Sequence, residues 1–211
     1  MTAQAGSAAL SPSSFDRESV RREMRARRRA LSANARHAAQ KKFVVIAQRS
    51  GLLKPGQKVG LYLAYGAEAD PSTLLDRARQ LRCTVFLPVI SDYRSNRMRF
   101  VPFDVRDKLI SNRFGIPEPR ARRFDSADVR ELDMIFLPLV AVDADGNRIG
   151  SGAGFYDRAL KHLRAGRHWR RPKLIGLAFE CQRVKHIPAE RWDVPLDALL
   201  TEKNLYRFTP R

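Results

Sequence analysis

Residues Met134–Val142 read MIFLPLVAV, and residues Asp143–Arg158 continue the chain as DADGNRIGSGAGFYDR. The first segment is a continuous apolar run bounded by polar residues, which is typical of a strand covered on both faces of a sheet. The second segment is rich in glycine and leads into a helical pattern over Phe155–Leu163. A buried strand, a glycine-rich turn and a helix therefore follow one another in this part of the chain.

The same alternation of strands and helices extends through most of the sequence. Apolar periodicity predicts helices over Asp16–Leu31, from Ser32 to about Arg49, and over Pro71–Leu81. Short apolar runs predict strands at Lys58–Ala64, Thr84–Val89, Met98–Phe103 and Leu174–Phe179, with a final short piece at Pro195–Leu200. This order predicts an α/β fold, as a single layered α/β/α domain over residues 15–211 with a largely parallel central sheet. Residues Val105–Glu131 are expected to form a long crossover, and residues 1–14 a disordered N-terminal tail.

The charge of the chain is strongly positive. Forty Lys and Arg residues face 22 Asp and Glu residues, which gives a formal net charge of +18. A solubilising surface explains such a balance, and so does a polyanionic partner such as RNA, an anionic membrane or a phosphorylated metabolite. Because aromatic and basic residues are not interleaved and no RNA motif stands out, nucleic acid is possible but is not favoured.

Cysteine content and hydropathy limit the class of protein. Cys83 and Cys181 each lie in an apolar run without a second cysteine nearby, so neither a disulfide scaffold nor a zinc site is expected. No stretch reaches the roughly 20 apolar residues that cross a bilayer. The start of the chain lacks the pattern of a secretory signal. We therefore expect a cytoplasmic protein and no membrane partner. The sequence does not indicate an oligomeric state.

The glycine-rich segment has the composition of an anion-binding loop. Glycine occupies every second position at Gly150, Gly152 and Gly154. The backbone can therefore take conformations that residues with a side chain rarely adopt, and no Cβ blocks a ligand at these positions. Successive backbone N–H groups can then face one phosphate. Arg148, at the entrance, can offer a forked donor. A tight structural turn explains the same glycines, and the order is neither GxGxxG nor a P-loop.

Two aspartates are candidate ligands of Mg²⁺. Asp157 lies one turn into the predicted helix, where a carboxylate repels bound phosphates unless a cation lies between them. The alternative is that Asp157 pairs with Arg158 or with the start of its own helix. Asp197 interrupts the last apolar piece and is the second candidate, with an edge-strand or capping role as its alternative.

The segment Asp143–Arg158 is similar to the signature of the 5-formyltetrahydrofolate cyclo-ligase family, whose members are also called methenyltetrahydrofolate synthetases. Other stretches resemble the family in the same order, so the resemblance covers the chain from about Arg17 to Phe208. They are RRALS at 28–32, LYLA at 61–64 with Glu68, FGIPEP at 114–119, IGLAF at 175–179, and Asp193 to Glu202 with Asp197.

The resemblance implies a 5-formyltetrahydrofolate cyclo-ligase. Such an enzyme uses ATP and Mg²⁺ to close 5-formyltetrahydrofolate into 5,10-methenyltetrahydrofolate, with release of ADP and phosphate. The γ-phosphoryl group passes to the formyl oxygen, and N10 then attacks the activated carbon. Positioning and charge neutralisation make up most of the catalysis in phosphoryl transfer.

Site residues also follow from the resemblance. It implies ATP contacts by Arg17, Arg21, Arg148, Ile149, Gly150, Ser151, Gly152, Ala153, Gly154, Phe155 and Tyr156. It implies substrate contacts by Leu63, Glu68, Phe114, Phe155 and Tyr156, catalytic roles for Arg148 and Tyr156, and metal binding by Asp157 and Asp197. For Arg17 and Arg21 the alternative is a solvated helix face, for Glu68 a surface carboxylate, and for Phe114 a core ring.

Two positions depart from the family pattern. Ala153 stands where relatives carry Gly or Lys, and Phe155 stands where many carry Tyr. We treat both as variation, because Arg17, Arg21 and Arg148 remain to supply positive charge. A divergent member that binds another phosphorylated metabolite is the remaining alternative. The basic surface also suggests that the protein attracts the negatively charged glutamate tails of folates. Polyglutamylated 5-formyltetrahydrofolate is therefore a candidate substrate.

Overall fold

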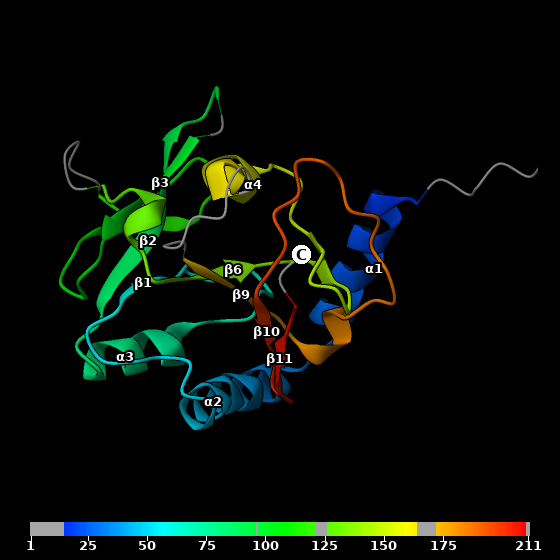
Figure 1. Cartoon of the computed structure of the whole chain (residues 1–211), viewed down its shortest axis with the longest axis horizontal. Helices are drawn as coiled ribbons and strands as arrows, with labels where there is room; N and C mark the ends of the chain where they lie inside the picture. The colour runs from blue at the N-terminus through cyan, green and yellow to red at the C-terminus, as the bar shows by residue number, and fades with distance from the viewer. Residues whose placement is uncertain (1–14, 96, 121–125, 164–171, 210–211) are drawn as a thin grey trace, which may run out of the picture.

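The computed structural model describes residues 15–95, 97–120, 126–163 and 172–209. The tail predicted for residues 1–14 therefore lies outside the described residues. A seven-stranded sheet with the order β11-β10-β9-β6-β1-β2-β3 forms the centre of the molecule (Figure 1). Its strands are β1 (Lys58–Gly60), β2 (Thr84–Asp92), β3 (Arg97–Pro102), β6 (Met134–Pro138), β9 (Lys173–Leu177), β10 (Ala198–Leu200) and β11 (Leu205–Arg207). Neighbouring strands from β10 to β2 pair in parallel, whereas β3 and β11 pair antiparallel at the two edges. The predicted α/β fold with a largely parallel sheet is confirmed.

The structure describes four α-helices, and the first two begin at a capping side chain. They are α1 (Arg17–Arg29), α2 (Ala33–Arg49), α3 (Ser72–Gln80) and α4 (Phe155–Leu160). The Asp16 carboxylate accepts from the N–H of Glu18 at the start of α1, and the Ser32 hydroxyl accepts from the N–H of Ala35 at the start of α2. Helices α2 and α3 lie against one face of the sheet, and α4 lies on the other (Figure 1).

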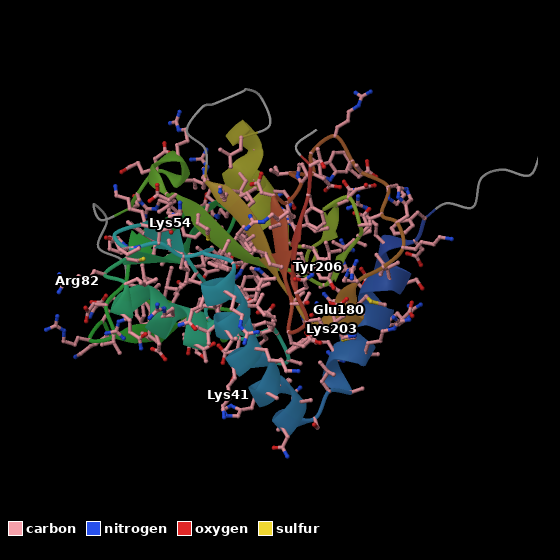
Figure 2. All side chains as sticks on the ribbon, turned by 60° about the horizontal axis from the view of Figure 1, so that its bottom comes forward. Lys41, Lys54, Arg82, Glu180, Lys203 and Tyr206 are labelled. Atoms are coloured by element: carbon pink, nitrogen blue, oxygen red, sulfur yellow. The ribbon has the colours of Figure 1, made fainter. Side chains whose placement is uncertain are left out.

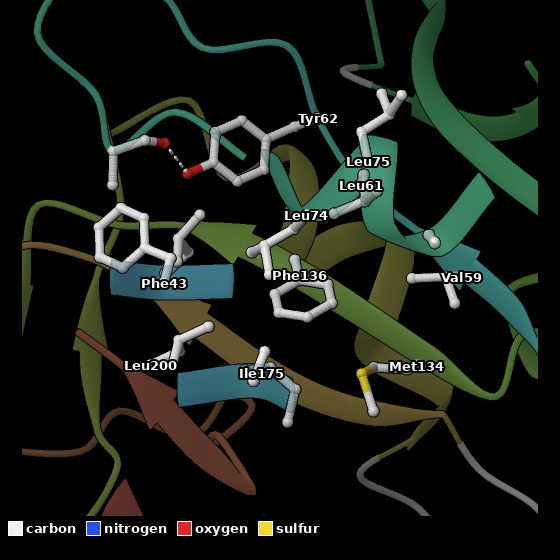
Figure 3. Packing of buried hydrophobic residues seen from close by; sticks show 14 of the residues in the cluster. Phe43, Val59, Leu61, Tyr62, Leu74, Leu75, Met134, Phe136, Ile175 and Leu200 are labelled. Carbon is white, nitrogen blue, oxygen red and sulfur yellow. Dashed lines mark hydrogen bonds between the residues drawn. The ribbon is translucent and has the colours of Figure 1, made fainter. Parts of the chain in front are cut away.

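Alternation along the strands divides the core into two layers. Met134 and Phe136 of β6 face α2 and α3, where Phe43 is fully buried among them (Figure 3). Ile135 and Leu137 of the same strand face the opposite layer, which contains Leu160 of α4. Each fully buried large apolar side chain contributes about 1.5–3 kcal/mol to folding.

The predicted strand Met134–Val142 is wrong in its second half. Strand β6 ends at Pro138, and Ala141–Val142 forms a separate strand, β7, that pairs antiparallel with β8 (Arg148–Ile149). The reason is the turn between β7 and β8: the Asp143 carboxylate accepts hydrogen bonds from the N–H groups of Asp145 and Asn147 and from the Asn147 amide. The glycine-rich segment therefore leaves a small hairpin rather than the central sheet.

The predicted crossover Val105–Glu131 contains structure of its own. Strands β4 (Leu109–Ser111) and β5 (Pro117–Pro119) form a hairpin, and a 3₁₀ turn, η1, covers Val129–Glu131. Two more 3₁₀ turns follow α4 and β9, at η2 (Lys161–Leu163) and η3 (Glu180–Gln182). The predicted strand Lys58–Ala64 is also shorter than expected, since β1 ends at Gly60. The residues after Gly60 turn toward the cavities described below.

Surface charge is spread over several elements. Lys41 lies on α2, Lys54 follows α2, and Arg82 follows α3, and all three side chains are exposed at separate places on the molecule (Figure 2). Among the described residues, no helix is long and apolar enough to span a membrane.

Candidate active site

Two adjoining cavities lie at the carboxyl ends of the parallel strands. The larger has a volume of about 350 Å³ and the smaller about 50 Å³. They share the lining residues Glu68, Pro138, Ser151, Phe155 and Tyr156. The carboxyl edge of an open α/β sheet is where such folds bind ligands. A ligand in one cavity would therefore touch a ligand in the other.

The larger cavity brings together all five residues expected to contact the substrate. Leu63, Glu68, Phe114, Phe155 and Tyr156 line it, and the rest of its wall is mostly apolar. Phe114 is 42% exposed, so it is not a core residue. Its ring meets the ring of Phe155 edge to face, with the ring centres 6.2 Å apart. The cavity suits a flat, largely apolar ring system.

A second aromatic residue and an arginine support Phe114 at the mouth of the cavity. The Tyr93 ring packs edge to face on Phe114 at 6.0 Å, and the Arg113 guanidinium lies 4.3 Å from the centre of the Tyr93 ring. Tyr93 follows β2 and Arg113 follows β4, so two hairpin ends meet here. Sequence reasoning missed both residues, because nothing in the sequence indicated that these hairpins converge.

Glu68 and Tyr156 are the titratable groups between the two cavities. Burial raises the pKa of the Glu68 carboxyl, although a hydrogen bond from the Tyr65 N–H and the nearby Arg28 guanidinium act in the opposite direction. Burial also raises the pKa of the Tyr156 phenol, and the neighbouring Glu68 carboxylate adds to this effect. Tyr156 is therefore a neutral hydrogen-bond donor at neutral pH. The loop that carries Glu68 is anchored by the Tyr62 hydroxyl, which donates to the Ala69 carbonyl at 2.5 Å (Figure 3).

The glycine-rich loop exposes a run of backbone donors. Gly152 has φ +114° and Gly154 has φ +67°, backbone conformations that favour glycine. In the part of the chain that the structure describes, the N–H groups of residues 151–154 have no protein acceptor. Ser151 lines both cavities, and Gly150 and Gly154 line the smaller one. This arrangement offers several donors to one anion.

Arg148 and Asp157 form a buried pair at the smaller cavity. The Arg148 guanidinium, whose side chain is 5% exposed, donates to Asp157 Oδ1 at 2.5 Å and to the Val194 carbonyl. Burial lowers the pKa of Arg148, while the Asp157 and Asp193 carboxylates raise it. The guanidinium of Arg148 that we expected to face phosphate lines the smaller cavity and holds Asp157 there. Among the ion pairs of the described residues, the partner of Asp157 is Arg148 and not the Arg158 that the alternative named.

The second predicted metal ligand is not brought to this place. Asp197 immediately precedes β10, and its carboxylate accepts from the Leu174 N–H at the amino end of β9, opposite the cavities. Asp193 lies closer to the Arg148–Asp157 pair than this. Its carboxylate raises the pKa of Arg148 and binds the Arg17 guanidinium at 2.7 Å. Sequence reasoning missed Asp193, although it lies only four residues before Asp197 within the stretch that resembles the family.

Four arginines of α1 face the site at spacings of three or four residues. Arg17 binds Asp193, Arg21 donates to the Gly150 carbonyl at 3.1 Å, and Arg25 donates to the Ser151 carbonyl at 2.9 Å. Arg28 lies half-buried near Glu68. Arg17 and Arg21 were predicted as phosphate contacts, whereas Arg25 and Arg28 were missed. The helical spacing of residues 17, 21, 25 and 28 was the available signal.

The remaining predicted ATP contacts differ in position. Ile149 is fully buried between α1 and the β7–β8 hairpin, so its side chain contributes to packing. Ala153 lines the larger cavity rather than the smaller one, and Gly152 is exposed outside both linings. The chain thus places its phosphate-type donors and its apolar pocket side by side.

Comparisons with known proteins agree with this geometry. Residues 13–202 match the 5-formyltetrahydrofolate cyclo-ligase family. The 5-formyltetrahydrofolate cyclo-ligase of Haemophilus influenzae is 33% identical over 87% of this chain and 96% of the relative. The Escherichia coli K12 protein of the same name is 32% identical over 71% of this chain and 80% of the relative.

Solved structures give the same result. The Aquifex aeolicus 5,10-methenyltetrahydrofolate synthetase superposes with a TM-score of 0.76 at 27% identity, covering 92% of this chain and 94% of the other. The synthetase from Mycoplasma pneumoniae shares the fold, with a TM-score of 0.66 at 21% identity over 89% of this chain and 99% of the other. The chain therefore belongs to the 5-formyltetrahydrofolate cyclo-ligase family of enzymes.

Proposed function

We propose that the protein converts 5-formyltetrahydrofolate into 5,10-methenyltetrahydrofolate, with ATP as co-substrate and ADP and phosphate as products. The observation that carries this proposal is the contact between two unlike cavities, one apolar and one lined by phosphate-type donors. Glu68, Ser151, Phe155 and Tyr156 belong to both walls. A formyl group held in the larger cavity would thus meet the γ-phosphate held beside it.

The phosphate side of the reaction is assigned to the glycine loop. The open N–H groups of residues 151–154 supply donors without a protein acceptor in the described chain. Arg21 and Arg17 on α1 add positive charge at the edge of this loop. Donors fixed before the substrate binds stabilise developing charge at no cost in reorganisation.

The folate side is assigned to the larger cavity. Phe114 and Phe155 form the aromatic wall on which a pterin ring would lie. The Glu68 carboxylate, which lies in this wall together with that of Glu118, would accept hydrogen bonds from the pterin or orient the formyl group. A few polar groups in an apolar pocket are the usual way in which a small-molecule site fixes orientation.

The chemistry then follows from placement. The formyl oxygen attacks the γ-phosphorus, the bond to the β-phosphate oxygen breaks, and ADP leaves. N10 attacks the resulting iminium phosphate and forms the new C–N bond. Phosphate then departs with the former formyl oxygen, and the N10 proton is released with it, as the methenyl bridge forms. In this proposal Tyr156 donates a hydrogen bond at this junction; its phenol lines both cavities, and burial keeps it protonated by raising its pKa.

The residues around Asp157 fit a magnesium ion. Mg²⁺ prefers carboxylate and phosphate oxygens, and the Asp157 carboxylate is 29% exposed at the wall of the smaller cavity. Asp193 is the second carboxylate near Arg148 and replaces Asp197 in our proposal. Bound there, the ion would offset the charge of the triphosphate. The Arg148 guanidinium holds Asp157 at this place.

The test is the appearance of the methenyl chromophore. Purified protein with 5-formyltetrahydrofolate and Mg-ATP is expected to produce it, and omission of ATP or chelation of Mg²⁺ is expected to stop it. ADP and phosphate should form in equal amounts with the product. Absence of product, with both substrates shown to be intact, would contradict the proposal.

We also propose a place for the glutamate tail of the folate. A third cavity of about 630 Å³ lies between β3 and α4. Met98 lines both this cavity and the apolar cavity of about 350 Å³ to which we assign the folate. Among the described residues, its wall carries four cations, Arg97, Arg99, Arg158 and Lys161, and one carboxylate, Asp92. A γ-linked tail of several carboxylates matches this charge.

Steady-state kinetics with mono- and triglutamyl substrates test the tail site. The wild type is expected to have the lower KM for the triglutamyl form at low salt, and Arg97→Ser/Lys161→Ser is expected to lose most of this difference. The matched control is Lys41→Ser/Lys54→Ser, which removes two exposed cations elsewhere (Figure 2). Equal KM values for the two substrates in the wild type would contradict the proposed tail site.

Nucleic-acid binding stays a prediction from the net charge alone. Gel shifts at physiological salt would check it.

A further inference from the structure

Two arginines of α1 hold consecutive carbonyl groups of the glycine loop. Arg21 Nε donates to the Gly150 carbonyl at 3.1 Å, and the Arg25 guanidinium donates to the Ser151 carbonyl at 2.9 Å. Glu18, one turn earlier, contacts both arginines, at 2.9 Å from Arg21 and 3.9 Å from Arg25. The two arginines are therefore fixed relative to each other and to the loop.

A planar trans peptide links the direction of these carbonyls to that of the next N–H groups. In such a peptide the carbonyl of one residue and the N–H of the following residue point in opposite directions. The carbonyls of Gly150 and Ser151 point to α1, so the N–H groups of Ser151 and Gly152 point away from it. These are two of the loop N–H groups that lack a protein acceptor within the described residues.

The cavities adjoin the Ser151 peptide. Ser151 lines both cavities and Gly150 lines the smaller one, whereas Gly152 is exposed and lines neither. In the described part of the chain, α1 contributes no lining residue. A Cβ added at Gly152 would meet no atom within 4 Å, so space remains on that side of the loop. The hydrogen bonds from Arg21 and Arg25 hold the carbonyl ends of the two peptides that precede and follow Ser151.

We propose that Arg25 is a positioning residue, which together with Arg21 turns the N–H groups of Ser151 and Gly152 away from α1 and so leaves them open to an anion at the smaller cavity. Arg25 acts on the loop backbone and not on the phosphate itself. This role rests on the proposed function only for the identity of the anion, which is the triphosphate of ATP. The geometry applies to any oligophosphate that enters the smaller cavity.

Backbone NMR of the folded full chain separates positioning from direct contact. Without ligand, the Gly152 amide signal is expected to shift or broaden in Arg25→Ala and to stay in place in Arg27→Ala, whose guanidinium pairs with Glu23 on the same helix. On titration with tripolyphosphate, the Ser151 and Gly152 signals of the wild type are expected to shift, with at least tenfold weaker affinity in Arg25→Ala. Arg25→Lys, which keeps a donor within reach of the carbonyl, is expected to recover most of the affinity.

Two outcomes would overturn the proposal. One is that the wild-type Ser151 and Gly152 signals do not respond to tripolyphosphate. The other is that anion affinity falls in Arg25→Ala while the free Gly152 signal is unchanged, which would mean that Arg25 touches the anion. Activity gives an independent check, because positioning predicts a raised KM for ATP with a nearly unchanged KM for folate. If the signals respond as expected but no methenyl product forms, the proposed function fails and the positioning role stands.

Discussion

Arg148 donates to Asp157 across 2.5 Å, and the arginine side chain is almost completely buried while the aspartate reaches the wall of the smaller cavity. The arginine therefore serves as a buried support for a carboxylate that faces the ligand. Removing one partner of such a pair leaves the other charge uncompensated, but the 29% exposure of Asp157 keeps the cost below the roughly 3–5 kcal/mol of a fully buried pair.

The first prediction concerns Asp157→Asn. The amide can still accept a hydrogen bond from Arg148, so the fold should persist, but the charge that would hold Mg²⁺ is lost. Turnover should fall by about 100-fold or more, the scale found when one preorganised electrostatic group is removed from an active site. Methenyl formation and the thermal midpoint are measured together. Asp197→Asn is the matched comparison: its carboxylate binds the Leu174 N–H away from the cavities, so it should change stability rather than the Mg²⁺ dependence of the rate.

The second prediction concerns Gly152→Ala. At φ +114° any side chain strains the backbone, at a cost of about 1–3 kcal/mol if the conformation is kept. The loop is expected to relax instead and to lose its alignment, which raises the KM for ATP with little change in the melting temperature. The control is Gly51→Ala, which also has a positive φ but follows α2 far along the chain from the loop. An unchanged KM for ATP in Gly152→Ala would show that this conformation is not needed.

The central strands and helices were predictable because each carries a local signal. The apolar run at Met134–Pro138 and the capping residues Asp16 and Ser32 mark their elements directly. The end of β6 was not predictable from hydropathy, since Leu139–Val142 is as apolar as the strand and is buried in the structure for another reason. Val140 and Ala141 pack in the same cluster as Met24 of α1, whereas Leu139 and Val142 belong to the layer that contains Leu160 of α4.

The site was predictable where the chain itself brings residues together. The loop from Gly150 to Asp157 is contiguous, so its role followed from composition and resemblance. Asp193 and Arg25 contribute through contacts between segments more than 100 residues apart in sequence, as in the Arg25 bond to Ser151 and the Arg17 bond to Asp193. Such pairs give no signal in a single sequence, because the side chains involved are common surface residues.

The third prediction uses the raised pKa of Glu68. Because burial raises the pKa of this carboxyl above its ordinary value of 4.5, the folded state binds the proton more tightly than the unfolded state does. Its contribution to stability is therefore complete below about pH 4.5 and is lost as the pH rises through the raised folded-state pKa. Relative to Glu68→Gln, the wild type should lose thermal stability over this window and then level off. Melting curves of both proteins between pH 4 and pH 8 measure the difference, and a difference independent of pH would contradict the burial effect.

The fourth prediction concerns Phe114, the aromatic residue at the mouth of the larger cavity. Phe114→Leu keeps apolar volume but loses the edge-to-face contacts with Tyr93 and Phe155 and the surface for a pterin ring. Such aromatic contacts are worth about 0.5–1.5 kcal/mol, so the KM for 5-formyltetrahydrofolate should rise about 2- to 10-fold. The KM for ATP should not change, and the melting temperature should change little because the ring is 42% exposed. Phe114→Trp, which keeps an aromatic face, should retain a KM close to that of the wild type. A raised KM in Phe114→Trp equal to that in Phe114→Leu would indicate that shape at this position matters and stacking does not.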